Sequence, residues 1–227
     1  DPLRVAEDAA VLDALCDGRL ELGFGTAGDR DGLFANNFQR LCDALRGAGV
    51  DARQRPMHPR GHRLLDDLWQ ATFSVSGGTR AGLGGCGLLL SRTQPRPPDT
   101  TLHDVQRPVV DAYLKALPAG RTARIGASRA VFVLRDGGKA KELASQGIAR
   151  HIDWLRRNDL PVPDVVDVNA GAPDEVIEML GADPIVTEAT DLIVQVHPVD
   201  PPAEYVLESI ELIAADVAPA LGWTRRA

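Results

Sequence analysis

The run with the clearest potential for chemistry is Ser74-Val75-Ser76-Gly77-Gly78, which follows a predicted strand and opens a predicted helix. Hydroxyl groups, free backbone N–H groups and the positive end of a helix together suit a phosphate group. The alternative is that Ser76 simply caps the helix, because serine is a favoured N-cap residue. The sequence leaves both interpretations open.

A second set of polar side chains lies at the ends of other predicted strands. Arg92 follows the third strand, and Gln195 and His197 end the fifth. Arg92 is a candidate to contact a phosphate or an anionic substrate. His197, which precedes Pro198, is a candidate to donate a hydrogen bond or to act as a base. A structural role at the strand end is the alternative for His197.

The other residues that often bind metals show no ligand spacing, so no metal site is expected. His151 lies on an amphipathic helix and is predicted to be structural. The three cysteines are an odd number without metal spacing, which fits reduced thiols in a cytoplasm. The tryptophans are predicted to anchor the core, and they are Trp69, Trp154 and Trp223.

The overall composition excludes some classes of partner. The chain has 227 residues and a net charge of −7, whereas binding to nucleic-acid phosphates needs a basic surface. No apolar run approaches the ~20 residues that are needed to cross a bilayer. We therefore expect a cytoplasmic protein with neither a nucleic-acid nor a membrane partner.

Predicted strands and helices alternate along the chain. The predicted strands cover residues 19–24, 68–74, 87–91, 123–134 and 191–197. The predicted helices cover residues 2–16, 33–46, 79–83, 109–117, 139–157, a segment from 173 onward, and 203–221. The polar stretch 158–172 is predicted to be a lid or excursion. This order predicts a parallel sheet, because each return to the sheet needs a crossover helix.

The first predicted helix begins at a cap formed by Asp1, with Pro2 at the first helical position. It carries a broad, alanine-rich apolar face. Small residues allow another helix to approach closely. This face therefore suits packing either on a second subunit or on the chain's own fold, and both alternatives remain open.

The strand count favours an incomplete barrel. A closed (β/α)8 barrel needs eight strands, and five are predicted here. The first three β/α units are thus expected to be missing from this chain. An open doubly wound sheet is the alternative, because residues 23–28 have the spacing G-x-G-x-x-G. No clear acidic residue that would bind a ribose follows on the second predicted strand.

Several stretches resemble the bacterial-luciferase-like family of flavin-dependent monooxygenases. Residues 5–25 resemble the family's third helix, the turn after it and the fourth strand. Residues 68–82 and 87–92 resemble the fifth strand, the phosphate-side loop and the sixth strand. Shorter similarities occur at residues 171–176, 210–214 and 218–223. The similarity extends over nearly the whole chain and is greatest to members predicted to depend on FMN.

The resemblance implies a single luciferase-like TIM-barrel domain over residues 1–227, incomplete at its N-terminus. It places the FMN phosphate at the Ser74 hydroxyl and at the backbone N–H groups of Ser76 to Gly78. Gly23 and Gly25 would let the flavin ring approach the backbone, unless they only form a tight turn. Cofactor contacts are therefore expected at Gly23, Gly25, Ala71, Thr72, Ser74, Ser76, Gly77, Gly78 and Arg92, and a catalytic role at His197.

The resemblance also implies the reaction. We expect an FMN-dependent monooxygenase that uses reduced flavin and dioxygen on a small organic substrate. A separate flavin reductase would supply the reduced flavin, and the protein is expected to be a homodimer. One alternative is a deazaflavin-dependent oxidoreductase that transfers a hydride. The other is a non-catalytic flavin-binding protein or fragment.

Overall fold

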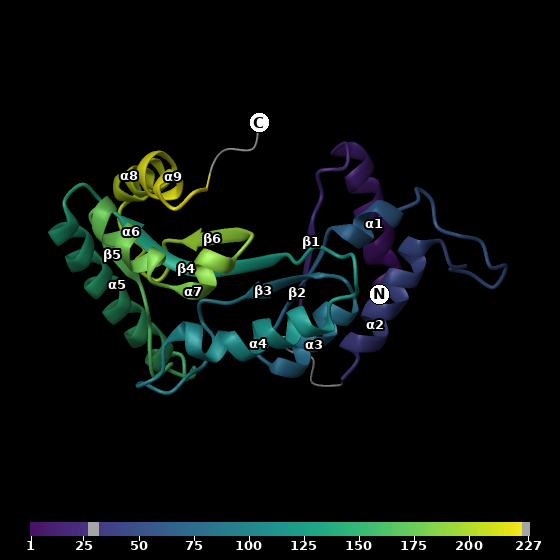
Figure 1. The fold of residues 1–227 in the computed structure, drawn as a ribbon, viewed down its shortest axis with the longest axis horizontal. Helices are drawn as coiled ribbons and strands as arrows, with labels where there is room; N and C mark the ends of the chain where they lie inside the picture. Colours follow the sequence, from purple (N-terminus) through teal and green to yellow (C-terminus); the bar gives the residue numbers. More distant parts are fainter. Residues whose placement is uncertain (27–31, 224–227) are drawn as a thin grey trace. The chain divides into compact units, whose positions relative to one another are not determined.

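The computed structural model describes residues 1–26 and 32–223, which form two compact units. Unit 1 contains residues 1–89 and 109–124, and unit 2 contains residues 90–108 and 125–227. Each unit combines parallel strands with helices, as Figure 1 shows for the chain in sequence colours. The α/β fold class predicted from the alternation of elements is therefore confirmed.

Unit 1 is built on three parallel strands. These are β1 (Leu22–Gly25), β2 (Leu68–Ala71) and β3 (Gly87–Leu90), the last residue of which belongs to unit 2. Gly25 lies opposite Ala71, which in turn lies opposite Leu89. The helices are α1 (Pro2–Leu15), α2 (Phe34–Arg46), the short 3-10 helix His62–Asp66, α3 (Val75–Leu83) and the second half of α4 (Leu102–Ala116).

The alanine-rich face of α1 packs within its own chain. Ala6 and Ala10 are buried in one cluster with Leu41 and Leu45 of α2. The predicted cap is present, because the Leu3 N–H donates to the Asp1 carboxylate at 2.8 Å. Several other apolar residues of α1 are exposed, namely Val5, Val11, Leu12 and Leu15. The homodimer stays a prediction.

Unit 2 is built around the nine-residue strand β4 (Ile125–Val133). The first half of β4 pairs with β6 (Asp191–Gln195), and the second half pairs with β5 (Asn169–Gly171), in both cases in parallel. The helices are α5 (Gly137–Arg157), α6 (Pro173–Gly181), α7 (Pro184–Glu188), α8 (Ala203–Leu212), a π-helical turn (Ile213–Val217) and α9 (Ala218–Ala220).

Several elements differ from the sequence-based predictions, among them β5 and α4. The described residues contain six strands rather than five, because β5 lies inside the stretch that was predicted to be a lid. Helix α4 begins at Leu102 instead of residue 109 and passes through Pro108. Its start is stabilised by reciprocal hydrogen bonds, in which the Asp104 N–H donates to the Thr101 hydroxyl and the Thr101 N–H to the Asp104 carboxylate.

The tryptophans only partly fulfil the predicted core role. Trp69 is buried, and its indole N–H donates to Glu21 at 2.6 Å. Trp154 is half exposed on α5, so the prediction was wrong for this residue. The cysteines are free thiols, as expected. Within the residues described, no helix is long and apolar enough to cross a membrane.

Candidate functional site

The first group of predicted site residues lies at the carboxyl ends of β1 and β2 in unit 1. Gly23 and Gly25 alternate with Leu22 and Phe24, which pack on the helical core. Both glycines are exposed, and neither has a positive φ angle. They continue the strand, so the tight-turn interpretation does not describe them. Ala27 and Gly28 of the glycine fingerprint lie outside the described residues.

Packing against the described residues does not require glycine at these two positions. A β-carbon added to Gly25 would lie 3.9 Å from Cβ of Ala71, and one added to Gly23 would lie 3.4 Å from the Leu89 side chain. These are van der Waals distances. The two glycines thus leave one face of β1 without side chains, and the described residues do not fill that space.

Helix α3 begins immediately beyond this strand end. Ser74 is its N-cap, because the Ser74 hydroxyl accepts the Gly77 N–H at 3.1 Å. Ser74 rather than Ser76 therefore caps the helix. The Ser74 carbonyl accepts the Gly78 N–H at 3.0 Å. Two of the three backbone N–H groups predicted to bind phosphate thus have acceptors inside the helix, whereas the Ser74 and Ser76 hydroxyls are exposed and 3.2 Å apart.

Gly77 and Gly78 have a structural reason to be glycine. A β-carbon on Gly77 would lie 1.9 Å from the Thr72 hydroxyl, and one on Gly78 would lie 2.4 Å from the Val109 carbonyl of α4. Thr72 is buried, and its hydroxyl accepts the Ser74 N–H at 3.1 Å. Thr72 therefore fixes the start of α3 from behind and is not exposed to a ligand.

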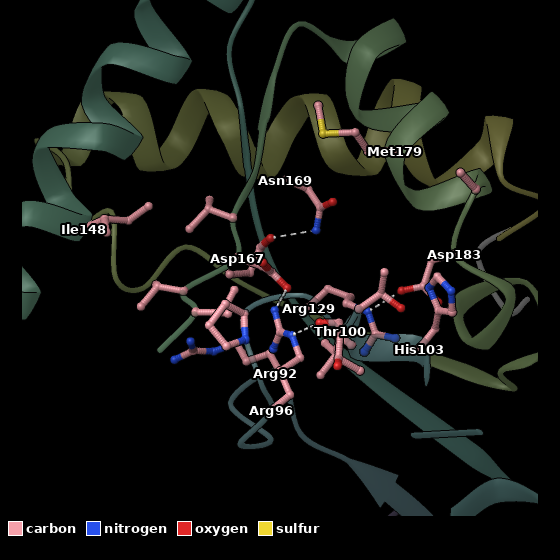
Figure 2. Close-up of a pocket in the computed structure, with 18 of the residues that line it drawn as sticks. Arg92, Arg96, Thr100, His103, Arg129, Ile148, Asp167, Asn169, Met179 and Asp183 are labelled. Atoms are coloured by element: carbon pink, nitrogen blue, oxygen red, sulfur yellow. Dashed lines mark hydrogen bonds and ion pairs between the residues drawn. The ribbon is translucent and has the colours of Figure 1, made fainter. Parts of the chain in front are cut away.

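A cavity of about 730 Å³ lies in unit 2. Figure 2 shows that it receives arginines from the segment after β3 and from β4, together with aspartates from the segments before β5 and α7. The labelled lining residues are Arg92, Arg96, Thr100, His103, Arg129, Ile148, Asp167, Asn169, Met179 and Asp183.

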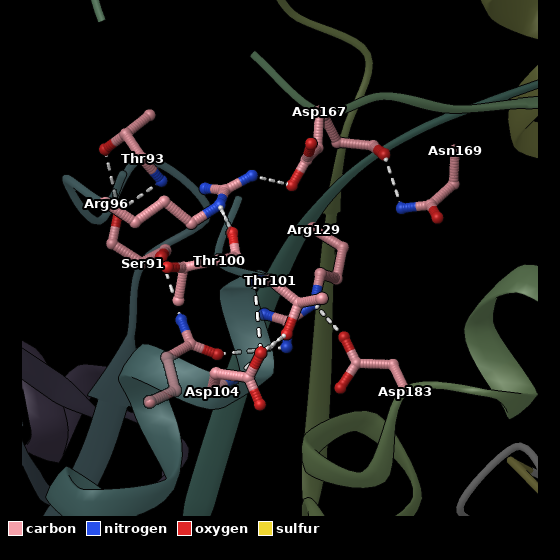
Figure 3. A network of polar contacts seen from close by, with 12 residues as sticks. Ser91, Thr93, Arg96, Thr100, Thr101, Asp104, Arg129, Asp167, Asn169 and Asp183 are labelled. Atoms are coloured by element: carbon pink, nitrogen blue, oxygen red, sulfur yellow. Dashed lines mark hydrogen bonds and ion pairs between the residues drawn. The ribbon is translucent and has the colours of Figure 1, made fainter. Parts of the chain in front are cut away.

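Two of these arginines are almost fully buried and are paired with carboxylates. Arg129 donates to Asp183 at 2.8 Å and to Gln106 at 3.0 Å, and its side chain is 4% exposed. Arg96 pairs with Asp167 and donates to the Thr100 carbonyl at 3.1 Å. Figure 3 shows these contacts as one polar network. Because each guanidinium already faces a carboxylate, the network is mainly structural.

Arg92 lies beside this network at the end of β3. Its Nε donates to Gln195 Oε1 at 2.8 Å, so two of the strand-end residues singled out in the sequence meet within unit 2. Burial lowers the pKa of Arg92. Arg92 and Arg96 also line a second cavity of about 370 Å³, which His151 and Pro198 close on another side.

His197 lies two residues beyond β6 and lines a third cavity of about 560 Å³ together with His151 and Trp154. Its Nδ1 is 2.8 Å from Asp200 Oδ2. The His151 ring meets the His197 ring edge to face, with the ring centroids 4.8 Å apart. Burial, followed by the charge of His197, lowers the pKa of His151.

The predicted site residues thus form two groups. One group lies in unit 1 and contains Gly23, Gly25, Ala71, Thr72, Ser74, Ser76, Gly77 and Gly78. Arg92 and His197 form the other group, in unit 2. Sequence reasoning missed the buried ion pairs, because Arg96 and Asp167 lie in predicted loops 71 residues apart. In the described part of the chain, no cluster of histidine, cysteine and acidic residues suits a metal ion.

Comparisons with known proteins place the fold. No protein-family model and no curated protein matches the chain. Among solved structures, the chain is similar to the monooxygenase RslO1 from Streptomyces bottropensis, with 21% identity, 96% of this chain and 74% of that one covered, and a TM-score of 0.68. It is also similar to the oxygenating constituent of 3,6-diketocamphane monooxygenase from Pseudomonas putida in complex with FMN. The identity is 17%, the match covers 100% of this chain and 78% of that one, and the TM-score is 0.70.

A third similar structure is the coenzyme F420-dependent tetrahydromethanopterin reductase from Methanopyrus kandleri. The identity is 16%, the match covers 98% of this chain and 80% of that one, and the TM-score is 0.63. At these identities the likeness concerns the fold. The predicted fold class, an α/β fold of the luciferase-like barrel type, is confirmed.

Proposed function

We propose that this protein is a flavin-dependent oxidoreductase of the bacterial-luciferase-like family, and specifically a monooxygenase that uses reduced FMN and dioxygen. Its substrate would be a small organic molecule, and a separate flavin reductase would supply the reduced flavin. When bound, the flavin supplies the redox chemistry, while the protein positions it and excludes water.

The observation that carries the proposal is the contrast among the glycines of unit 1. Gly77 and Gly78 are required by packing, whereas Gly23 and Gly25 are exposed, and the described residues around them would accept a β-carbon. A flat ring that approaches the backbone accounts for the absence of side chains there.

The start of α3 suits the phosphate of the same cofactor. The exposed Ser74 and Ser76 hydroxyls lie at the positive end of a nine-residue helix. These hydroxyls would hold the phosphate, with the Gly77 and Gly78 N–H groups serving to shape the helix start. Ala71, opposite Gly25, would lie under the ring.

The second candidate cofactor is a deazaflavin, because one similar structure is a coenzyme F420-dependent reductase. Such an enzyme would transfer a hydride and would not need dioxygen. In either case Arg92, whose Nε is held by Gln195, would contact an anionic group, and His197 would exchange a proton with the substrate.

The phosphate site can be tested apart from helix stability. In Ser74→Asp the N-cap is retained, since aspartate is a favoured cap, but a negative charge is placed beside the phosphate. We expect FMN affinity to fall by at least about tenfold, or about 1.4 kcal/mol. Ser74→Gly, which costs the cap only a few tenths of a kcal/mol, should weaken FMN by about 1–2 kcal/mol. Flavin fluorescence titration measures both.

The matched control is Ser145→Asp, the same change at an exposed serine of α5 in unit 2. It should leave FMN affinity unchanged. If Ser74→Asp also binds FMN with wild-type affinity, the phosphate is held elsewhere and the assignment is wrong.

The reaction type can be tested by oxygen consumption. With a flavin reductase, NAD(P)H and FMN, we expect substrate-dependent uptake of dioxygen across a panel of alkanals, ketones and sulfonates. Turnover with reduced deazaflavin in the absence of oxygen would select the hydride-transfer candidate. Absence of both flavin binding and turnover would favour the non-catalytic interpretation.

A further inference from the structure

The contact between His197 and Asp200 defines which ring nitrogen faces a ligand. Nδ1 of His197 lies 2.8 Å from a carboxylate oxygen of Asp200. An ionised carboxylate can only accept hydrogen bonds, so Nδ1 must carry the proton. Nε2 is then the nitrogen that can take up or release a proton. Both side chains line the 560 Å³ cavity and are accessible from it.

The loop that carries Asp200 is fixed to helix α5. The Arg150 guanidinium donates to the Val199 carbonyl at 2.8 Å and to the Asp200 carbonyl at 3.4 Å. One turn earlier, a β-carbon on Gly147 would lie 2.3 Å from the Val199 carbonyl, so glycine is needed for this close approach. Val199 itself is fully buried. Packing and hydrogen bonds therefore hold the backbone from which the Asp200 carboxylate projects.

Asp200 occupies a backbone conformation that few residue types tolerate. Its φ is 44°, in the left-handed region where aspartate, asparagine and glycine are the favoured residues. In this backbone conformation, the Asp200 side chain contacts His197, three residues earlier in the chain. The choice of residue at position 200 thus combines a backbone requirement with a charged contact.

The groups around His197 come from three segments. Asp200 supplies a carboxylate from the same loop, and α5 supplies His151 and Arg150. Arg92, from the segment after β3, is close enough to lower the pKa of His151, whereas Asp200 raises it. His151 lines both the 370 and the 560 Å³ cavities, whereas His197 and Asp200 line the 560 Å³ cavity.

We propose that Asp200 is a positioning residue for His197, and that the two form a carboxylate–imidazole dyad facing the 560 Å³ cavity. Nε2 of His197 takes a proton from an O–H or acidic C–H group of the substrate, and the resulting imidazolium is stabilised by Asp200. The same proton is returned to the product or released to water. The part of this inference that concerns the substrate rests on the function proposed above.

The tautomer of His197 tests the dyad without cofactor or substrate. Nitrogen-15 NMR of the full chain at neutral to alkaline pH should show neutral His197 protonated at Nδ1. In Asp200→Gly, which suits the positive φ but removes the carboxylate, this preference should be lost. In Asp200→Asn, whose amide oxygen can still accept, it should persist. His151→Phe, which keeps a ring against His197, should also retain it.

A second NMR signal reports the charge at position 200. Because the Asp200 carboxylate raises the pKa of His151, Asp200→Asn should shift the His151 titration to lower pH. An unchanged His197 tautomer in Asp200→Gly would overturn the dyad.

Turnover tests the role of the dyad. Both His197→Gln and Asp200→Gly should lower kcat by about 100-fold, the usual range for losing a general acid or base, and Asp200→Asn should retain more activity than Asp200→Gly. If the tautomer changes as expected while kcat is unaffected in an active enzyme, the positioning role is wrong. If wild-type protein binds no flavin, the proposed function is wrong. The NMR results would still show whether the Asp200 carboxylate accepts a hydrogen bond from His197.

Discussion

The arginine network of unit 2 and the start of α3 in unit 1 are both polar, but they differ in whether their polar groups are paired within the protein. In unit 2, Arg129 and Arg96 are buried and paired with Asp183 and Asp167. In unit 1, the start of α3 carries no charged side chain in its first turn, and its serine hydroxyls are exposed. The more strongly charged region is thus the one that needs no ligand.

The contrast shows why charge alone is a poor guide to a binding site. A buried charge is tolerated only when it is paired, so a buried ion pair is usually explained by the stability of the fold and not by a ligand. Fold stability does not explain exposed glycines and hydroxyls at a strand end in this way. A ligand is the simplest reason for them, which is why the proposed cofactor site lies there.

The largest expected effect comes from breaking the buried network. Arg129→Ala would leave the Asp183 carboxylate and the buried Gln106 without this partner, and should lower the free energy of unfolding by about 3–5 kcal/mol. Chemical denaturation measures the loss. The control is Arg4→Ala, which removes an exposed i,i+4 pair with Asp8 and should change little. Equal effects in the two variants would mean that burial does not distinguish the pairs.

A smaller effect is expected at the packed glycine of α3. Alanine at position 78 would bring a β-carbon to 2.4 Å from the Val109 carbonyl, and should destabilise by about 1–3 kcal/mol as overpacking usually does. In Gly181→Ala, on α6, the new β-carbon would be 3.8 Å from Leu221, so helix propensity should give a gain of up to about 1 kcal/mol. Melting temperatures that move in the same direction would contradict this distinction.

The smallest effect concerns a partly buried ion pair in unit 1, between Arg63 and Asp13. Hydrogen bonds from Arg63 lower the pKa of Asp13. A carboxyl with a lowered folded-state pKa stabilises the protein above its unfolded pKa of about 4, and this stabilisation is lost as the pH falls through the folded-state value. Asp13→Asn should therefore lower the melting temperature at pH 7, and the difference from wild type should shrink below about pH 4.

The control for this prediction is Asp8→Asn, on the same helix, where both members of the ion pair are exposed. Its melting temperature should follow wild type across the pH range. A difference between Asp13→Asn and wild type that persists at pH 2 would show that packing, and not the charge of Asp13, is responsible.

Local signals in the sequence determined most of the element order. Asp1 caps α1, Gly47 ends α2 with φ at 94°, and Pro173 starts α6, each where short-range chemistry predicts it. Periodic apolar residues and caps act within a few residues, so a sequence can report them directly. The alternation of these elements was enough to predict the α/β fold class.

Only the tertiary structure decided which polar groups meet. The three-residue strand β5 exists because β4 offers it an edge, and Asp167 lies beside Arg96 because that strand places it there. The glycines are a second example. The sequence shows only that positions 25 and 77 are glycine, whereas the structure shows which atoms a β-carbon at each position would meet. Contacts between distant residues depend on how the elements pack, and no local pattern carries that information.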